Sequence, residues 1–248
     1  TPEDGSGFVF GDSILFTGLV TDEDIPNTEL TVDISSSLDG DLQRLNPDTD
    51  GFFSFETSAL SSGTHTVTVI ASDEVGAECT TSLVVSVGTP PTTTIDEPLD
   101  GAIITVGEPV TFMGTVSDVE DSSDQIAVVW NSDLDGELQS GNANSQGLSE
   151  FTNSDLSAGV HTISFTATDT IGLVSEDTVG IRINTLPVVD SITFSPDPVY
   201  TTDNLVVSTT GSDVDGQNVT MTHAWYEDGT LTSFTGTTID SAEMDVGE

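Results

Sequence analysis

The sequence predicts an all-β protein built from tandem antiparallel sandwiches, and two observations support this fold class. Residues 60–73 (LSSGTHTVTVIASD) return as residues 156–169 (LSAGVHTISFTATD), a shift of 96 positions that also aligns the flanking stretches. Apolar residues alternate with Thr and Ser through both copies, and no stretch has the spacing of an amphipathic helix. A register that holds over so long a span indicates one structural unit copied in tandem.

Each copy contains about seven short segments that alternate apolar and polar residues, separated by turns rich in Asp and Gly, which is the pattern of an antiparallel sandwich. Alternating residues of a strand point to opposite faces, so one set in each segment is expected to face the core. The expected inward-facing residues are Ile14, Phe16, Gly18, Val20, Leu30, Val32, Ile34, Phe53, Phe55, Val67, Val69, Ala71, Leu83, Val85 and Val87 in the first copy, and Val110, Phe112, Gly114, Val116, Ile126, Val128 and Trp130 in the second.

The repeat length predicts three units, which we call the first repeat (1–88), the second repeat (89–185) and the third repeat (186–248). Short linkers that contain proline join them, which predicts semi-rigid placement. The first repeat lacks the opening strand that residues 93–95 supply in the second. The third is diverged and partial: strands are expected around Leu205 and over 219–225, and its last two strands are missing. We therefore expect a segment excised from a longer repetitive chain.

The chain is strongly acidic, with 43 Asp and Glu against two basic residues, Arg44 and Arg182. Nucleic acid and anionic membrane surfaces are excluded as favoured partners, because phosphate contacts need clustered Lys and Arg. Two explanations of the acidity stay open: solubility in a saline medium, where salt screens self-repulsion, and carboxylates gathered around divalent cations. No apolar run approaches the roughly 20 residues of a membrane span.

Cys79 is the only cysteine, so no internal disulfide can form. Cys79 alternates in step with the inward-facing Leu83, so its side chain is expected to point to the core. This predicts a buried, inert thiol.

Residues 156–169, preceded by WNSDLDGEL at 130–138, resemble the immunoglobulin-like and PKD-like repeats of bacterial and archaeal cell-surface proteins. Residues 212–216 (SDVDG) and 224–229 (AWYEDG) are similar to a sister class found in very acidic chains. The Gly-Asp-Gly loop of strict PKD modules is absent. The resemblance implies tandem immunoglobulin-like β-sandwiches, two complete and a partial third, in an extracellular or cell-surface stalk or adhesion array that is frequently loaded with calcium.

Acidic loops are expected to meet at one end of each sandwich, because the loops after its second and sixth strands and the incoming linker lie at that end. Calcium takes six to eight oxygen ligands, and carboxylates without a basic partner repel one another unless a cation intervenes. The alternative is that these residues are solvated turn residues, as Asp commonly is. The candidate calcium ligands are Asp22, Asp24 and Asp73 in the first repeat, Asp118, Glu120, Asp121 and Asp169 in the second, and Asp213 and Asp215 in the third.

Residues 46–51 (NPDTDG) resemble the opening of an EF-hand loop, but Thr57 stands where a bidentate Glu is needed, so a turn is expected. His65 and His161 occupy one repeat position, close to where immunoglobulin folds place a corner tyrosine that bonds back to the backbone. A structural hydrogen bond is therefore expected of both histidines. No motif of a nucleophile elbow, a zinc helix or a phosphate loop is present, which argues against an enzyme.

These observations predict a structural, non-catalytic spacer or adhesion array, stiffened by calcium and flanked by further repeats of the same chain. One alternative is a subunit of an extracellular filament or surface layer, in which neighbouring copies add a strand to the partial third repeat. Another is an accessory binding module of a secreted hydrolase. That module would need exposed aromatic residues, whereas Trp130 and Trp225 are both expected in the core.

Overall fold

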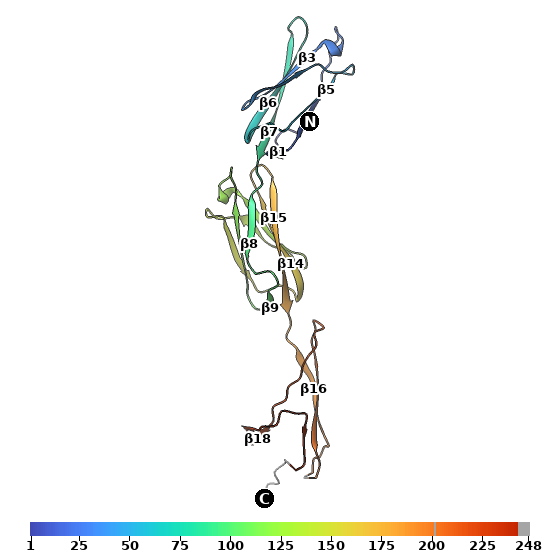
Figure 1. The fold of residues 1–248 in the computed structure, drawn as a ribbon, viewed down its shortest axis with the longest axis vertical. Helices are drawn as coiled ribbons and strands as arrows, with labels where there is room; N and C mark the ends of the chain where they lie inside the picture. The colour runs from blue at the N-terminus through green and yellow to red at the C-terminus, as the bar shows by residue number, and fades with distance from the viewer. Residues whose placement is uncertain (201, 243–248) are drawn as a thin grey trace. The chain divides into compact units, whose positions relative to one another are not determined.

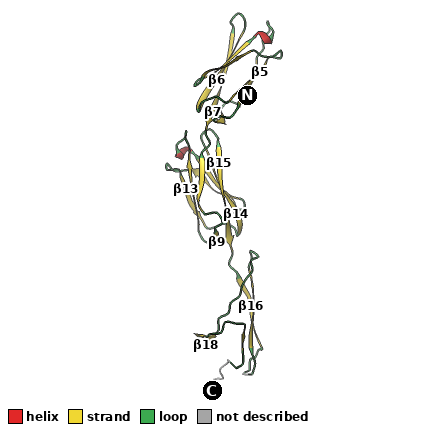
Figure 2. Cartoon of the chain, viewed as in Figure 1, coloured by secondary structure: helices red, strands yellow, loops and turns green. Residues whose placement is uncertain are grey.

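The computed structural model describes residues 1–200 and 202–242, and strands dominate this part of the chain (Figures 1 and 2). The only helical turns in the described residues are two short 3-10 turns, η1 (Asn27–Glu29) and η2 (Ser123–Gln125). The predicted fold class is confirmed: the chain is all-β and forms tandem immunoglobulin-like sandwiches. The repeat boundaries stay predictions, and the repeat names serve below as labels for the sequence.

Packing divides the chain into two compact units. The first holds residues 1–100, 111–152 and 162–180, and the second holds 101–110, 153–161 and the chain from Ile181 onward. The sheets are described one at a time below.

The first repeat has a five-stranded sheet in the order β1 (Ser6–Val9), β7 (Glu78–Gly88), β6 (Gly63–Ser72), β3 (Thr31–Ser36) and β4 (Gly40–Leu45). A second sheet pairs β2 (Ile14–Leu19) with β5 (Phe52–Thr57). The core between them contains Ile14, Phe16, Val32, Ile34, Phe53, Leu60, Val67, Ala71, Val85 and Val87, with Phe55, Val69 and Leu83 partly buried against it. The alternation of the sequence therefore placed the inward faces correctly.

The second repeat repeats this plan with one strand more. Its larger sheet runs β12 (Gly136–Asn142), β11 (Ala127–Ser132), β14 (Gly159–Thr168), β15 (Val174–Asn184) and β9 (Ile103–Thr105). Its smaller sheet runs β13 (Leu148–Asn153), β10 (Val110–Ser117) and β8 (Thr92–Glu97). The added strand is β8, which lies antiparallel to β10.

Trp130 lies at the centre of the second repeat and is fully buried, as expected. Its ring stacks on Phe165 with centroids 4.3 Å apart and meets Phe112 edge-on at 5.6 Å. Its indole N–H donates to the Ser149 hydroxyl at 3.1 Å, so the one polar atom of the ring is satisfied. A Cβ at Gly114 would lie 2.7 Å from the Phe165 ring, which explains why this inward position is glycine.

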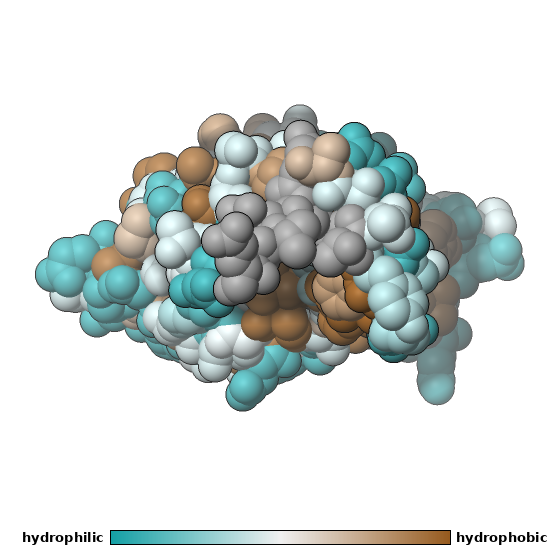
Figure 3. Space-filling view, turned by 90° about the horizontal axis from the view of Figure 1, so that it is seen from below, coloured by the Kyte–Doolittle hydropathy of each residue, from teal (hydrophilic) through white to brown (hydrophobic). Residues whose placement is uncertain are grey.

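The third repeat is less regular. Strands β16 (Val188–Ser195), β17 (Leu205–Ser212) and β20 (Thr238–Ile239) form one sheet, and β18 (Tyr226–Glu227) and β19 (Thr230–Leu231) form a hairpin. All eight residues of β16 are exposed. In Figure 3, which looks at the molecule from below, apolar surface shows between hydrophilic side chains. Residues 243–248 of this predicted repeat lie outside the described residues.

The prediction of a strand over 219–225 is wrong. The described chain is irregular over these residues, and the two-residue strand β18 begins directly after them, at Tyr226. The equivalent strands β3 and β11 pair with β6 and β14, respectively, and no described strand of the third repeat corresponds to those partners. A strand without a partner leaves its backbone groups unpaired. Trp225 is accordingly half-buried, not in a core, and meets Phe194 edge-on at 6.1 Å.

Candidate functional site

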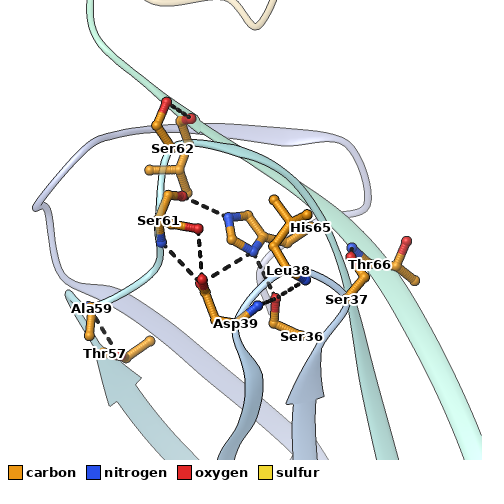
Figure 4. A network of polar contacts seen from close by, with 11 residues as sticks. Ser36, Ser37, Leu38, Asp39, Thr57, Ala59, Ser61, Ser62, His65 and Thr66 are labelled. Atoms are coloured by element: carbon orange, nitrogen blue, oxygen red, sulfur yellow. Dashed lines mark hydrogen bonds and ion pairs between the residues drawn. The ribbon is translucent and has the colours of Figure 1, made fainter.

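The two corner histidines have a structural role, and Figure 4 shows the contacts of His65. His65 is fully buried at the start of β6, and its Nε2–H donates to the Ser61 carbonyl at 2.8 Å. The Ser36 hydroxyl accepts the Leu38 and Asp39 N–H groups, so its own proton donates to His65 Nδ1 at 2.8 Å. Both ring nitrogens thus have a hydrogen-bond partner. The expected hydrogen bond to the backbone is confirmed.

His161 repeats the arrangement in the second repeat: it is fully buried, and its Nε2 lies 2.7 Å from the Ser157 carbonyl oxygen. The position is thus used in the same way in both copies.

The carboxylate of Asp39 joins the His65 network. It accepts the Ser61 hydroxyl at 2.7 Å and the Ser61 N–H at 3.0 Å, and lies 3.5 Å from His65 Nδ1. The Ser61 hydroxyl is the main reason that the pKa of Asp39 lies below its usual value. A catalytic triad needs the histidine Nε2 free to accept a serine proton. Here the Ser61 carbonyl occupies Nε2, so the cluster is not arranged as a catalytic triad and instead ties the loop at Ser61 to the strand that carries His65.

The predicted acidic loops form one local turn in every repeat. The Oδ1 atoms of Asp22, Asp118 and Asp213 each accept the N–H of the residue two positions later, at 2.7–2.8 Å. Asp73 and Asp169 likewise accept two backbone N–H groups each, at 2.7–3.0 Å. These are the turn roles that Asp commonly fills. One oxygen of each of these five carboxylates is therefore already used as an acceptor.

The structure brings Asp118, Asp121 and Asp169 close together in the second repeat. Burial, followed by the charges of Asp118 and Asp121, raises the pKa of Asp169, which is only 8% exposed. The second oxygen of Asp118 is buried and has no hydrogen-bond partner. Asp121 binds the hydroxyl and N–H of Thr170 at 2.9–3.0 Å. In the first repeat, Asp22 and Asp73 line one surface pocket.

The arrangement does not form a ready metal site. Within residues 1–200 and 202–242, no group of three or more His, Cys, Asp or Glu side chains is placed to hold a metal ion. Calcium at these loops therefore stays a prediction, and the solvated-turn alternative accounts for most of the contacts.

Two of the acidic residues bind the linkers instead. The Glu120 carboxylate accepts the Thr89 hydroxyl at 2.7 Å, the Thr89 N–H at 3.2 Å and the Ser62 hydroxyl at 2.8 Å. Asp215 accepts the Thr185 N–H at 2.6 Å and the Thr185 hydroxyl at 2.8 Å. We call these two contacts the linker clasps. Hydrogen bonds to an ionised carboxylate are roughly twice as strong as neutral ones.

The clasps lower the pKa of both carboxylates. For Glu120 the main cause is the Thr89 hydroxyl, and for Asp215 it is the Thr185 N–H. Sequence reasoning named both acids as metal ligands and missed their threonine partners. A signal was present, because Thr89 and Thr185 occupy one position of the repeat. Asp24, the equivalent acid of the first repeat, is exposed, and no side-chain bond to a linker threonine is found for it in the described chain.

No protein-family model and no curated protein sequence matches the chain. Several solved structures are similar in fold. The fibronectin(III)-like modules of Clostridium thermocellum CbhA are 18% identical, with a TM-score of 0.49, over 75% of this chain and 92% of that one. The titin I-band fragment I67–I69 is 14% identical, with a TM-score of 0.41, over 91% of this chain and 83% of that one.

The first eight immunoglobulin domains of Down Syndrome Cell Adhesion Molecule are 14% identical, with a TM-score of 0.38, over 93% of this chain and 34% of that one. Identities and TM-scores this low carry no argument about what the present chain does.

The prediction of a buried Cys79 is wrong, because this thiol is exposed. The predicted face of the strand was right, because Cys79 lines a groove of the first repeat together with inward-facing residues such as Leu83. The groove is uncovered, so facing inward does not bury the side chain. None of the described helical segments has the length and apolar character that a membrane crossing requires.

Proposed function

We propose that the chain is a structural, non-catalytic spacer of an extracellular or cell-surface protein, an array of immunoglobulin-like repeats whose linkers are held by acidic side chains. The observation that carries the proposal is the pair of linker clasps, Glu120 on Thr89 and Asp215 on Thr185. A linker whose hydroxyl and N–H are both bound has fewer conformations than a free tether, because each bond fixes backbone dihedrals. The buried corner histidines, each bonded through Nε2 to a backbone carbonyl, support a non-catalytic role.

The clasps are tested by replacing the linker threonine. Thr89→Val keeps the β-branched shape and removes the hydroxyl that donates to Glu120. We expect greater flexibility of residues 88–92, seen as faster amide hydrogen exchange there, with no change in the exchange of β6 or β14. The matched control is Thr66→Val, an exposed threonine on β6. Equal exchange in wild type and Thr89→Val would remove the observation on which the proposal rests.

Calcium stiffening is the finer part of the proposal. It is supported by the buried, unpartnered oxygen of Asp118 and by the burial and like charges that raise the pKa of Asp169, since a cation would give the oxygen a partner and offset the repulsion. We expect millimolar calcium to raise the melting temperature more than magnesium does at equal ionic strength, and Asp118→Asn to remove the difference. Glu150→Gln, an exposed acid of β13, is the control. An equal response to calcium, magnesium and sodium would assign the acidity to a saline medium.

A filament or surface-layer subunit is the second candidate. The exposed β16 and the irregular third repeat favour it, because strand addition supplies backbone hydrogen bonds to an open sheet. Light scattering over a hundredfold range of concentration separates the two: the spacer stays a monomer, whereas the subunit forms ordered polymers.

A further inference from the structure

Two glycines at one end of the first repeat are not required by its own fold. Gly7 lies in β1 and Gly88 at the end of β7, and neither has a positive φ. The equivalent positions of the second repeat hold Ile103 and Asn184, in strands β9 and β15 that pair in parallel in the same register. Since the same sheet accepts side chains at these positions, the two glycines need another explanation.

The explanation lies in the loop between β14 and β15, at Ile171. A Cβ at Gly7 would overlap the Ile171 carbonyl oxygen, and a Cβ at Gly88 would lie 2.9 Å from Ile171 Cδ1. All three residues belong to the first compact unit. The backbone of the loop therefore passes so close to β1 that only glycine fits at position 7.

The tip of this loop is held in shape by its own hydrogen bonds. The Asp169 Oδ1 atom accepts the Ile171 N–H at 2.9 Å and the Leu173 N–H at 2.7 Å. Asp73 holds Val75 in the same way in the first repeat, so Asp-x-aliphatic-Gly is a turn of the repeat. Val75 is 79% exposed, whereas Ile171 is half-buried. A preorganised turn loses little conformational entropy when it docks.

The two glycines differ in what faces them. Beside the contact lies a cavity of about 160 Å³, to which Gly88 and Ile171 both contribute. This cavity leaves room for the flexible end of the Ile171 side chain. The Ile171 carbonyl, in contrast, belongs to the backbone of the turn that Asp169 holds, and it cannot move away alone. Position 7 therefore controls the contact more strictly than position 88.

We propose that Gly7 and Gly88 form a docking surface, the glycine seat, for the Asp-x-aliphatic-Gly turn of the following repeat, and that this contact fixes the angle between the first and second repeats. Larger residues at the two positions, such as Ile103 and Asn184, would close such a seat. The inference deepens the proposed spacer function, on which it rests, because it identifies a joint that is held by packing as well as by a linker clasp.

Distances between two spin labels test the seat in the whole chain. Cys79→Ser removes the native thiol, and Ser54→Cys and Thr152→Cys place one label on an exposed position of each repeat. We expect a narrow distance distribution in this parent and one about twofold broader in Gly7→Ala, because adjacent domains move relative to one another unless packing holds them. Gly88→Ala should broaden the distribution less.

Gly141→Ala is the matched control. This glycine of β12 also lacks a positive φ, and a Cβ there would meet nothing within 4 Å. It should leave the distance distribution unchanged. If Gly7→Ala does not fold, Ile171→Ala gives a second test, since it removes the aliphatic tip of the turn and leaves β1 as it is. It too should broaden the distribution.

The glycine seat is overturned if the parent distribution is already as broad as that of Gly7→Ala, or if Gly141→Ala broadens it equally. A larger effect of Gly88→Ala than of Gly7→Ala would also overturn it, because the side chain of Ile171 and not its backbone would then control the joint. None of these results alters the amide exchange of residues 88–92, so the seat and the linker clasps can fail separately.

Discussion

The first and second repeats share one plan and differ in how their cores are filled. The second repeat places Trp130 and Phe165 where the first has Ile34 and Val69, and its sheet is completed by β8. In the second repeat the small residue Ser149 faces Trp130, leaves room for its ring and accepts the indole N–H. In the first repeat the equivalent pair is Phe53 and Ile34. A large and a small residue have thus exchanged places. The comparison teaches that the repeat conserves volume and sheet order more strictly than residue identity.

The largest effect is expected from breaking this exchange. Trp130→Ile should destabilise the second repeat by about 3 kcal/mol, because it leaves a cavity beside Ser149. Adding Ser149→Phe installs the pair found in the first repeat and should recover about 0.5–3 kcal/mol through direct coupling. Urea unfolding followed by circular dichroism gives both values. Strict additivity of the two changes would show that the two positions do not share one volume.

The corner histidines sharpen the comparison, because here the repeats are the same. His65→Ala and His161→Ala should each cost about 1–3 kcal/mol, since each removes a fully buried side chain together with its hydrogen bond to a serine carbonyl. Neighbouring exposed residues give the controls, Thr66→Ala and Val160→Ala, which should stay within about 0.5 kcal/mol. The measurement is the unfolding free energy of each variant. A loss in one repeat without the other would contradict a common role.

The inward glycines should respond unequally. Gly114→Ala places a Cβ 2.7–2.9 Å from two aromatic rings in a closed core, and we expect a loss near the upper end of the 1–3 kcal/mol typical of overpacking. Gly18→Ala places a Cβ 2.5 Å from the Phe53 ring, but this ring lines the open groove and can shift into it. Its loss should be near the lower end. Equal losses measured by thermal unfolding would mean that the groove gives Phe53 no freedom.

The smallest effect concerns pH and compares Glu120 with its counterpart Asp24. The pKa of Glu120 is lowered from 4.5, so its clasp stabilises the fold above about pH 4.5 and loses this contribution as pH falls through the lower folded value. Glu120→Gln should flatten the pH dependence of stability in that window and cost roughly 0.2–1 kcal/mol at neutral pH, since the group is exposed. Asp24→Asn is the control and should change neither. Melting temperatures between pH 3 and 7 test both statements.

Much of the fold was predictable because the information is local. Period-two alternation identified the inward faces, and the constant register identified the repeat. The corner histidines followed from one repeat position near a known corner. What failed depended on partners distant in sequence. The strand at 219–225 needs a neighbour that the described third repeat does not contain, and Cys79 needs a cover that strand parity does not report.

The candidate site was predictable in part for the same reason. Acidic loops at the linker end were found from composition and sandwich topology. The bonds of Glu120 to Thr89 and of Asp215 to Thr185 join residues 31 and 30 positions apart, and loop geometry decides which oxygen meets which donor. Counting carboxylates therefore indicated cation ligands where the structure places acceptors for threonine.

The spacing of the two linker clasps has a consequence for how such a chain changes length. Each clasp joins partners separated by about a third of a repeat, so both partners are carried on one short stretch of the gene. Gain or loss of whole units leaves every surviving joint with its own acid and its own threonine. Longer and shorter versions of the array can then arise by duplication or deletion alone, without a new contact having to evolve at the seam.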